Sequence, residues 1–95
     1  MTTTKTKRPP AIPNTLKTAH EGDYFLILIP NHWARGETIE DAKRALTANS
    51  GRKASEWKAW RVYSVHPSTY VDEMGSMTRD GGTPAPVELA EHNPG

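Results

Sequence analysis

The chain has 95 residues, no cysteine and nearly balanced charge, with 12 lysines and arginines against 11 aspartates and glutamates. This length allows one domain at most, and the lack of cysteine excludes disulfides and thiolate metal sites. The start of the chain lacks the apolar segment of a secretory signal, and the longest apolar run is far shorter than a membrane span. We therefore expect a soluble, cytoplasmic protein without membrane contact.

Composition divides the chain into three parts. Residues 1–20 contain prolines, no acid and four basic residues, namely Lys5, Lys7, Arg8 and Lys17. They predict a flexible basic arm that is either disordered or ordered only by Ile12 and Leu16 draping over the core. Residues 21–79 predict the compact domain. Residues 80–95, which are acidic and rich in proline and glycine, predict a flexible tail.

The strongest strand signal lies at residues 23–29. After Asp23 come six aromatic or aliphatic residues, YFLILI, and Pro30 then withholds an amide from the ladder. Both alternating faces of this segment are apolar, which is typical of a strand that is covered on both sides or is central in a sheet.

A helix is predicted from Thr38 to Gly51, after a polar link at residues 31–37. The Thr38 hydroxyl can accept from the amide of Asp41, as in a capping box, and Gly51 can adopt the left-handed conformation that ends a helix. Between them, the apolar side chains form one stripe, made of Ile39, Ala42, Ala45 and Leu46.

A second strand is predicted to begin at residue 57 or 59 and to end at residue 65. This segment is rich in aromatic and β-branched side chains. Residues 69–71 and 77–78 predict a weak third strand or a hairpin. The expected fold is thus a small α+β or α/β domain of the form β-α-β(β), with one helix packed on a two- to three-stranded sheet.

One candidate site depends on how the two main strands pair. If they are parallel neighbours, the ends of both strands and the start of the helix share one edge of the domain. That edge gathers histidines, hydroxyls, a guanidinium and helix amides, from His32, Trp33, Arg35, Gly36, Thr38, His66, Ser68 and Tyr70. It is a candidate anion or small enzyme site, although polar loops and helix capping explain the same residues. No catalytic motif or metal-ligand spacing accompanies it, so we expect no catalytic residue, metal or cofactor.

A second candidate is the mixture of aromatic and basic residues at 57–63, which comprises Trp57, Lys58, Trp60, Arg61 and Tyr63. Aromatic and cationic side chains together hold single-stranded nucleic acid, and Trp, Tyr and Arg also anchor protein interfaces. Core packing is the third interpretation, and the one that the short supply of phenylalanine favours.

The helix start, GETIEDA at residues 36–42 followed by Ala45 and Leu46, resembles the G-x-T-[LI]-E-E-A segment of HicB-type antitoxin domains. In that family the segment follows a strand and opens a helix that lies on a small sheet, so the resemblance implies such a unit here. The length and the proline-flanked ends also look like small bacteriophage accessory proteins.

Three functions follow from these patterns. The first is a non-enzymatic protein-interaction module, such as a phage-encoded factor that binds a protein in the host cytoplasm, and it includes a possible homodimer. Its predicted interaction residues are His32, Trp33, Arg35, Trp57, Trp60, Arg61, Tyr63, His66 and Tyr70. The second is nucleic-acid binding through the basic arm and residues 57–63. The third is a small enzyme at the edge that holds His32 and His66.

Overall fold

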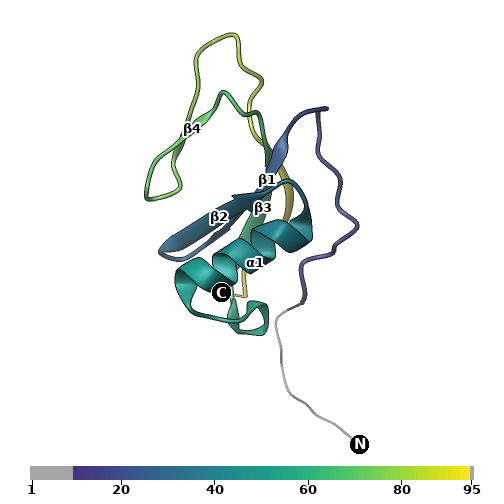
Figure 1. Cartoon of the computed structure of the whole chain (residues 1–95), viewed down its shortest axis with the longest axis vertical. Coiled ribbons are helices and arrows are strands. Elements are labelled where there is room, and N and C mark those ends of the chain that lie inside the picture. The colour runs from purple at the N-terminus through teal and green to yellow at the C-terminus, as the bar shows by residue number, and fades with distance from the viewer. Residues whose placement is uncertain (1–9, 95) are drawn as a thin grey trace, which may run out of the picture.

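The expected α+β fold, with one helix on a sheet, is confirmed (Figure 1). The computed structural model describes residues 10–94, so the predicted arm residues Lys5, Lys7 and Arg8 lie outside the described residues. Its elements are β1 (Tyr24–Ile29), β2 (His32–Gly36), α1 (Ile39–Ser50), the 3-10 helix η1 (Ala54–Glu56), β3 (Trp60–Val65), β4 (Tyr70–Val71), β5 (Met77–Thr78) and β6 (Val87–His92).

The main sheet of the described chain has four strands in the order β2-β1-β3-β6, and every neighbouring pair is antiparallel. β4 and β5 form a separate antiparallel pair. β1 is therefore a central strand, as its apolar faces predicted, and the sheet is wider than the expected two or three strands. The two main strands are neighbours but run in opposite directions, so the condition for a shared edge, parallel pairing of β1 and β3, is not met.

The residues predicted as a polar link form β2 instead. Pro30 and Asn31 make a two-residue turn, in which Asn31 takes a left-handed φ of 71°, and β2 then returns antiparallel along β1. The segment HWARG lacks a run of apolar side chains, so its strand state depends on pairing with β1. This hairpin brings the chain back to the starting end of β1 before the helix begins, which explains why a parallel crossover does not form.

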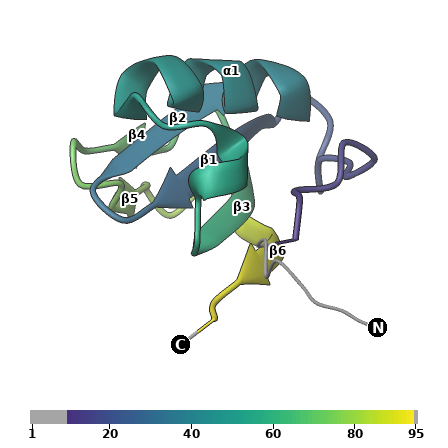
Figure 2. The same ribbon diagram turned by 90° about the horizontal axis from the view of Figure 1, so that it is seen from below.

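Both predicted caps of α1 are present. The Thr38 hydroxyl accepts from the amide of Asp41 at 3.0 Å, and Gly51 takes a φ of 71° while its amide donates to the Thr47 carbonyl. Between the caps, α1 lies over β2 and β1 (Figure 2). The approach is closest at Gly36, where an added Cβ would lie 2.5 Å from the backbone nitrogen of Ala42.

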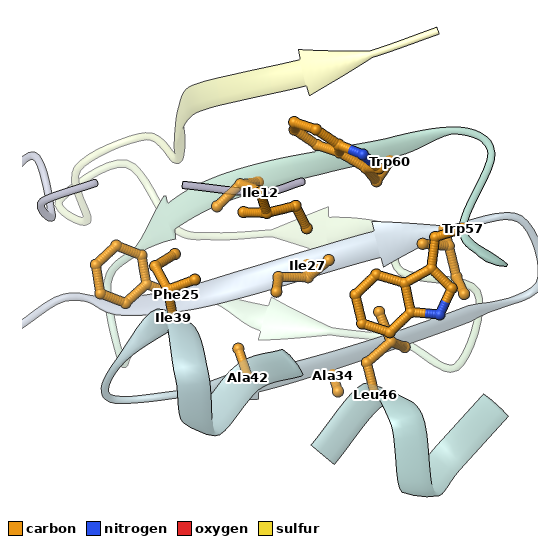
Figure 3. Packing of buried hydrophobic residues seen from close by; sticks show 11 residues of the cluster. Ile12, Phe25, Ile27, Ala34, Ile39, Ala42, Leu46, Trp57 and Trp60 are labelled. Carbon is orange, nitrogen blue, oxygen red and sulfur yellow. The ribbon is translucent and has the colours of Figure 1, made fainter. Parts of the chain in front are cut away.

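One face of the sheet carries the larger core (Figure 3). Phe25 and Ile27 of β1 and Val62 of β3 meet the stripe of α1, where Leu46 is fully buried. The remainder of this face is covered by Ile12 of the N-terminal segment, Trp57 of the link after η1, and Trp60 at the start of β3.

The opposite face carries a second, smaller core. Tyr24 and Leu26 of β1 pack with Val65 of β3, and Val71 and Met77 of the β4–β5 pair cover them. The alternation of large apolar side chains along β1 thus places three of them in each core, as the sequence predicted.

The N-terminal segment 10–20 belongs to the fold. Ile12 is buried, and its carbonyl accepts from Lys43 Nζ on α1 at 2.6 Å. Further along, the Ala19 amide donates to Ser64 Oγ at 2.9 Å, and that hydroxyl donates to the carboxylate of Asp23 at 2.7 Å. Of the two expectations for this segment, the one in which Ile12 and Leu16 lie over the core describes residues 10–20.

The expected flexible tail also needs correction, because residues 87–92 form β6 and pair with β3. Leu89 and Ala90 contribute to the larger core, which extends the compact part beyond the predicted limit at residue 79. The segment VELAEH is too polar to predict a strand by itself. It becomes a strand because it pairs with the side of β3 that β1 leaves free.

The close approach at Gly36 yields a test with a matched control. Gly36→Ala should lower the free energy of unfolding by about 1–3 kcal/mol, because the methyl group forces α1 away from β2. Gly81→Ala, where an added Cβ meets nothing within 4 Å, should change it by less than about 0.5 kcal/mol. Urea unfolding of both variants measures the difference, and equal stability would contradict the packing described.

The anchoring of the N-terminal segment yields a second test. Ile12→Ala should lower the free energy of unfolding by about 2–4 kcal/mol, because Ile12 is 4% exposed in the larger core. Thr15→Ala, at an exposed position of the same segment, is the control and should have little effect. If Ile12→Ala proved as mild as the control in thermal unfolding, residues 10–20 would not be part of the folded core.

Candidate functional site

The predicted site that joined His32 to His66 does not form. His32 pairs with Ile29 at one end of β1, whereas His66 follows Val65, which pairs with Tyr24 at the other end. Five residue steps along a strand separate these ends by about 17 Å. The two histidines therefore cannot act together on one small substrate, because the parallel pairing on which that candidate site depended does not occur.

Residues near His66 form local turns on the far side of the molecule from His32. The His66 Nδ1 accepts from the amide of Ser68 at 3.0 Å, which explains both residues as parts of a turn. Tyr70 of β4 is 67% exposed and is separated from the main sheet by that turn.

The aromatic and basic residues at 57–63 divide between the core and the surface. Trp57 and Trp60 are 3% and 5% exposed. Of the three interpretations of this segment, core packing is therefore the one that the structure shows for both tryptophans. Tyr63 is half-buried beside the smaller core, and Arg61 and Lys58 are exposed. No stacking platform is therefore formed by the two tryptophans.

The β2 edge of the sheet is shielded by α1. The side chain of Asn49 reaches from α1 and donates to the carbonyl of Trp33 at 2.8 Å, which shows that this carbonyl faces away from β1. On the same strand, the Arg35 guanidinium lies 5.0 Å from the centre of the Tyr24 ring, in a cation–π contact. A helix over an edge strand is one of the ways in which proteins block the addition of further strands.

The β6 edge is open. Among the described elements, β6 packs against β3, and its outer side carries no further strand. Val87, Glu88 and Glu91 are exposed, and β6 lies away from α1 (Figure 2). Unpaired amides and carbonyls along such an edge are a template for another strand.

A bulge in β6 places its two glutamates on the same face. Glu88 lies opposite Tyr63 and Glu91 lies opposite Arg61, with the register shift between them. Because Tyr63 and Arg61 are two residues apart, their side chains share a face of the sheet, and so do the two glutamates. The pKa of Arg61 is raised by its hydrogen bond to Tyr63, by its electrostatic interaction with the same residue, and then by the charges of Glu91 and Glu88.

A hollow of about 330 Å³ adjoins the end of β6. Its walls come from the end of β1, the β1–β2 turn, the start of β3 and the end of β6. The residues that line it include Leu28, Pro30, Trp60, Arg61 and His92. Met74, which is 77% exposed, lines it from the loop between β4 and β5. The volume is at the small end of the range for ligand pockets, roughly 300–1,000 Å³.

The open edge and the hollow together form the candidate site. Of the predicted interaction residues, it includes Trp60 and Arg61, with Tyr63 beside it, while His32, Trp33, Arg35, Trp57, His66 and Tyr70 lie elsewhere. Sequence reasoning missed Glu88, Glu91, His92 and Met74. The sequence signal that could have indicated this strand is weak. It is the short segment VELAEH between Pro86 and Pro94, in which only the valine and the leucine favour a strand.

Comparison with family models, with curated proteins and with solved structures finds no match to this chain. Within residues 10–94, no helix has the length and apolarity needed to cross a membrane. Over the same residues, no three histidine or acidic side chains are grouped in a way that would hold a metal ion.

The loop that leads into β6 provides a test by titration. The pKa of Asp80 is lowered, first by the hydroxyl of Thr83 at 2.9 Å and then by the amide of Gly82 at 3.1 Å. Its stabilising effect is therefore present above the pKa of the unfolded chain and is lost as the pH falls through the lower pKa of the folded chain. A carboxyl NMR titration should place Asp80 below an ordinary aspartate, and Thr83→Ala should raise it; no change in that variant would contradict the loop geometry.

Proposed function

We propose that the protein is a non-enzymatic binding protein that recognises an extended, basic segment of another protein by adding it as a fifth strand to the outer edge of β6. The observation that carries the proposal is that β6 is the open edge of the described sheet, whereas the β2 edge is shielded by α1 and Asn49. Strand addition supplies main-chain hydrogen bonds for affinity, and neighbouring side chains supply specificity.

The charge of β6 determines which partner suits it. Glu88 and Glu91 are exposed on one face of the strand, and Arg61 lies 3.7 Å from Glu91 as a partial counterion. A partner strand with basic side chains on that face would gain two opposite-charge pairs across the new ladder. A partner with acidic side chains there would be repelled.

The hollow at the end of β6 offers a second recognition element. Leu28 and Met74 give it an apolar wall, and His92 and Arg61 give it polar groups at the strand end. We propose that it takes an apolar side chain from the partner segment beyond the paired residues. The flexible thioether of an exposed methionine suits such a variable contact.

Nucleic acid is the weaker candidate, for two reasons. The open edge is acidic and would repel phosphates, and the two tryptophans nearest to it are buried. The basic residues Lys5, Lys7 and Arg8 lie outside the described residues, so no described surface supports this function.

The biological setting remains part of the proposal. A phage-encoded factor that binds a host protein would act through such a surface, and the HicB-like helix start at residues 36–46 is compatible with a role in protein binding. The open edge and its charge support binding to a protein without identifying the partner.

A displayed library of random nine-residue peptides tests the function directly. The protein should enrich peptides with basic residues at alternating positions, because these align with the face that holds Glu88 and Glu91. The double variant Glu88→Lys, Glu91→Lys should bind the enriched peptides about tenfold more weakly, as two attractive cross-strand pairs become repulsive. Peptide affinities can be measured by fluorescence anisotropy.

The matched control reverses the charge of two acidic residues at another place on the surface. Glu37→Lys combined with Glu40→Lys alters two exposed acids at the start of α1 and should leave the peptide affinities unchanged. If both double variants weakened binding equally, the effect would be one of net charge, and the β6 site would be rejected. Failure of the library to yield any β6-dependent peptide would also overturn the proposal.

A further inference from the structure

A second hollow, of about 250 Å³, lies next to the hollow at the end of β6. The two share an apolar wall, made of Ile29, Pro30 and Ala59. The other residues that line the second hollow come from the link between α1 and β3, and they are Arg52, Glu56, Trp57 and Lys58. We call it the Trp57 hollow, and the proposed function does not use it.

The Trp57 hollow adjoins a buried hydrogen-bond donor that lacks an acceptor. Trp57 is 3% exposed, and its indole nitrogen has no hydrogen-bond partner within residues 10–94. The indole nitrogen of Trp60, by contrast, donates to the carbonyl of Pro10 at 3.3 Å. Figure 3 shows the benzene ring of Trp57 toward Ile27 and its nitrogen on the side of the indole away from Ile27. Because buried N–H groups are nearly always paired, this donor indicates a place for an acceptor atom.

Two cationic side chains line the same hollow. Arg52 and Lys58 are exposed, and neither forms an ion pair with an acidic residue of the described chain. The acid that lines the hollow, Glu56, accepts from the backbone amide of Lys53 at 2.8 Å, so it is already engaged in capping η1. Two positive charges against one negative charge leave the hollow with a positive balance, which favours an anion.

The short helix η1 explains why the donor and the cations lie together. The amide of Trp57 donates to the carbonyl of Ala54 at 3.1 Å, which closes the turn. After this turn the side chain of Trp57 enters the larger core, while Lys58 remains exposed beside it. Arg52 lies on the other side of η1, directly after the cap of α1 at Gly51.

We infer that the Trp57 hollow binds a small organic acid, whose carboxylate accepts from the indole nitrogen of Trp57. The charges of Arg52 and Lys58 stabilise the carboxylate, since hydrogen bonds and ion pairs to charged oxygens are the stronger ones. The apolar wall shared with the hollow at the end of β6 contacts the hydrocarbon part of the acid. The volume lies just below the usual range of ligand pockets, roughly 300–1,000 Å³, and therefore suits a short acid.

The site is independent of strand addition at β6. Its polar groups come from Arg52, Trp57 and Lys58, which belong neither to β6 nor to the hollow at its end. Binding of the acid is thus a further function, and it does not rest on the proposed one.

Titration of the full chain with sodium butyrate at constant ionic strength tests the site by proton–nitrogen NMR. The indole N–H signal of Trp57, assigned with Trp57→Phe, should shift and saturate as the carboxylate accepts from it. The indole signals of Trp33 and Trp60 should move much less. Butyramide has the same shape without the charge and should bind about tenfold more weakly, and so should inorganic phosphate, which lacks the hydrocarbon part.

Charge-neutral variants identify the residues that hold the acid. Arg52→Gln with Lys58→Gln should weaken butyrate binding about tenfold, because the carboxylate loses both stabilising charges. The matched control, Lys17→Gln with Arg44→Gln, removes one lysine and one arginine at exposed positions elsewhere and should leave the affinity unchanged. All four substitutions replace exposed side chains, so the comparison is made between folded proteins.

Three outcomes would overturn the inference. The first is a Trp57 signal that does not shift or does not saturate with butyrate. The second is equal weakening in the two double variants, which would assign the effect to net charge. The third is binding of butyramide or phosphate as tight as that of butyrate, which would exclude selection of an acid with a hydrocarbon part.

A further variant separates this site from the proposed function. Glu88→Lys with Glu91→Lys should bind butyrate as the unaltered chain does, although it loses the peptides that add to β6. If butyrate binds and no peptide does, the proposed function fails and the acid site remains. If peptides bind at β6 and butyrate does not bind, the acid site alone fails.

Discussion

The structure depends on one strand that is apolar on both faces. β1 presents Phe25, Ile27 and Ile29 on one side and Tyr24, Leu26 and Leu28 on the other. Burying such side chains is the main favourable term in folding, and in a chain of 95 residues there are few elements available to cover two faces. Every other element can be understood by which face of β1 it covers or extends.

The requirement for cover explains why the fold reaches beyond its expected limits. α1 covers only the part of the larger core above β2 and β1, so Ile12 from the N-terminal segment, Trp57 after η1 and Trp60 at the start of β3 complete it. The smaller core is closed by the β4–β5 pair, which has two residues in each strand. Segments that look too polar to fold alone are thus ordered by the apolar surface that β1 and β3 offer.

Whether an element could be predicted from sequence depended on whether its signal is local. β1 and α1 were predictable because their signals are local: an apolar run ended by Pro30, and caps at Thr38 and Gly51. β2 and β6 were not, because HWARG and VELAEH become strands only through partners distant in sequence or across a turn without a strong hairpin signature. The candidate site was largely missed for that reason, since it is built on β6, and the predicted pairing of His32 with His66 failed with the strand direction.

The two edges of the sheet differ in a way that bears on function. At β2, α1 packs over the strand and Asn49 occupies the outward carbonyl of Trp33, whereas at β6 two glutamates and a bulge are the features that limit strand addition. Under the proposed function, charge and bulge together make the edge selective, because a neutral or acidic strand gains little there and a basic one gains cross-strand pairs. A selective edge is what distinguishes a recognition surface from a liability to aggregation.

The central claim is that residues 87–92 are the outer strand of the sheet. NMR measurement of cross-strand nuclear Overhauser effects tests it most directly. The account predicts contacts between the backbone protons of Arg61 and Glu91 and of Tyr63 and Glu88, with Leu89 displaced as a bulge. Random-coil shifts over residues 87–92 without such contacts would contradict it, and would remove the edge on which the proposed function rests.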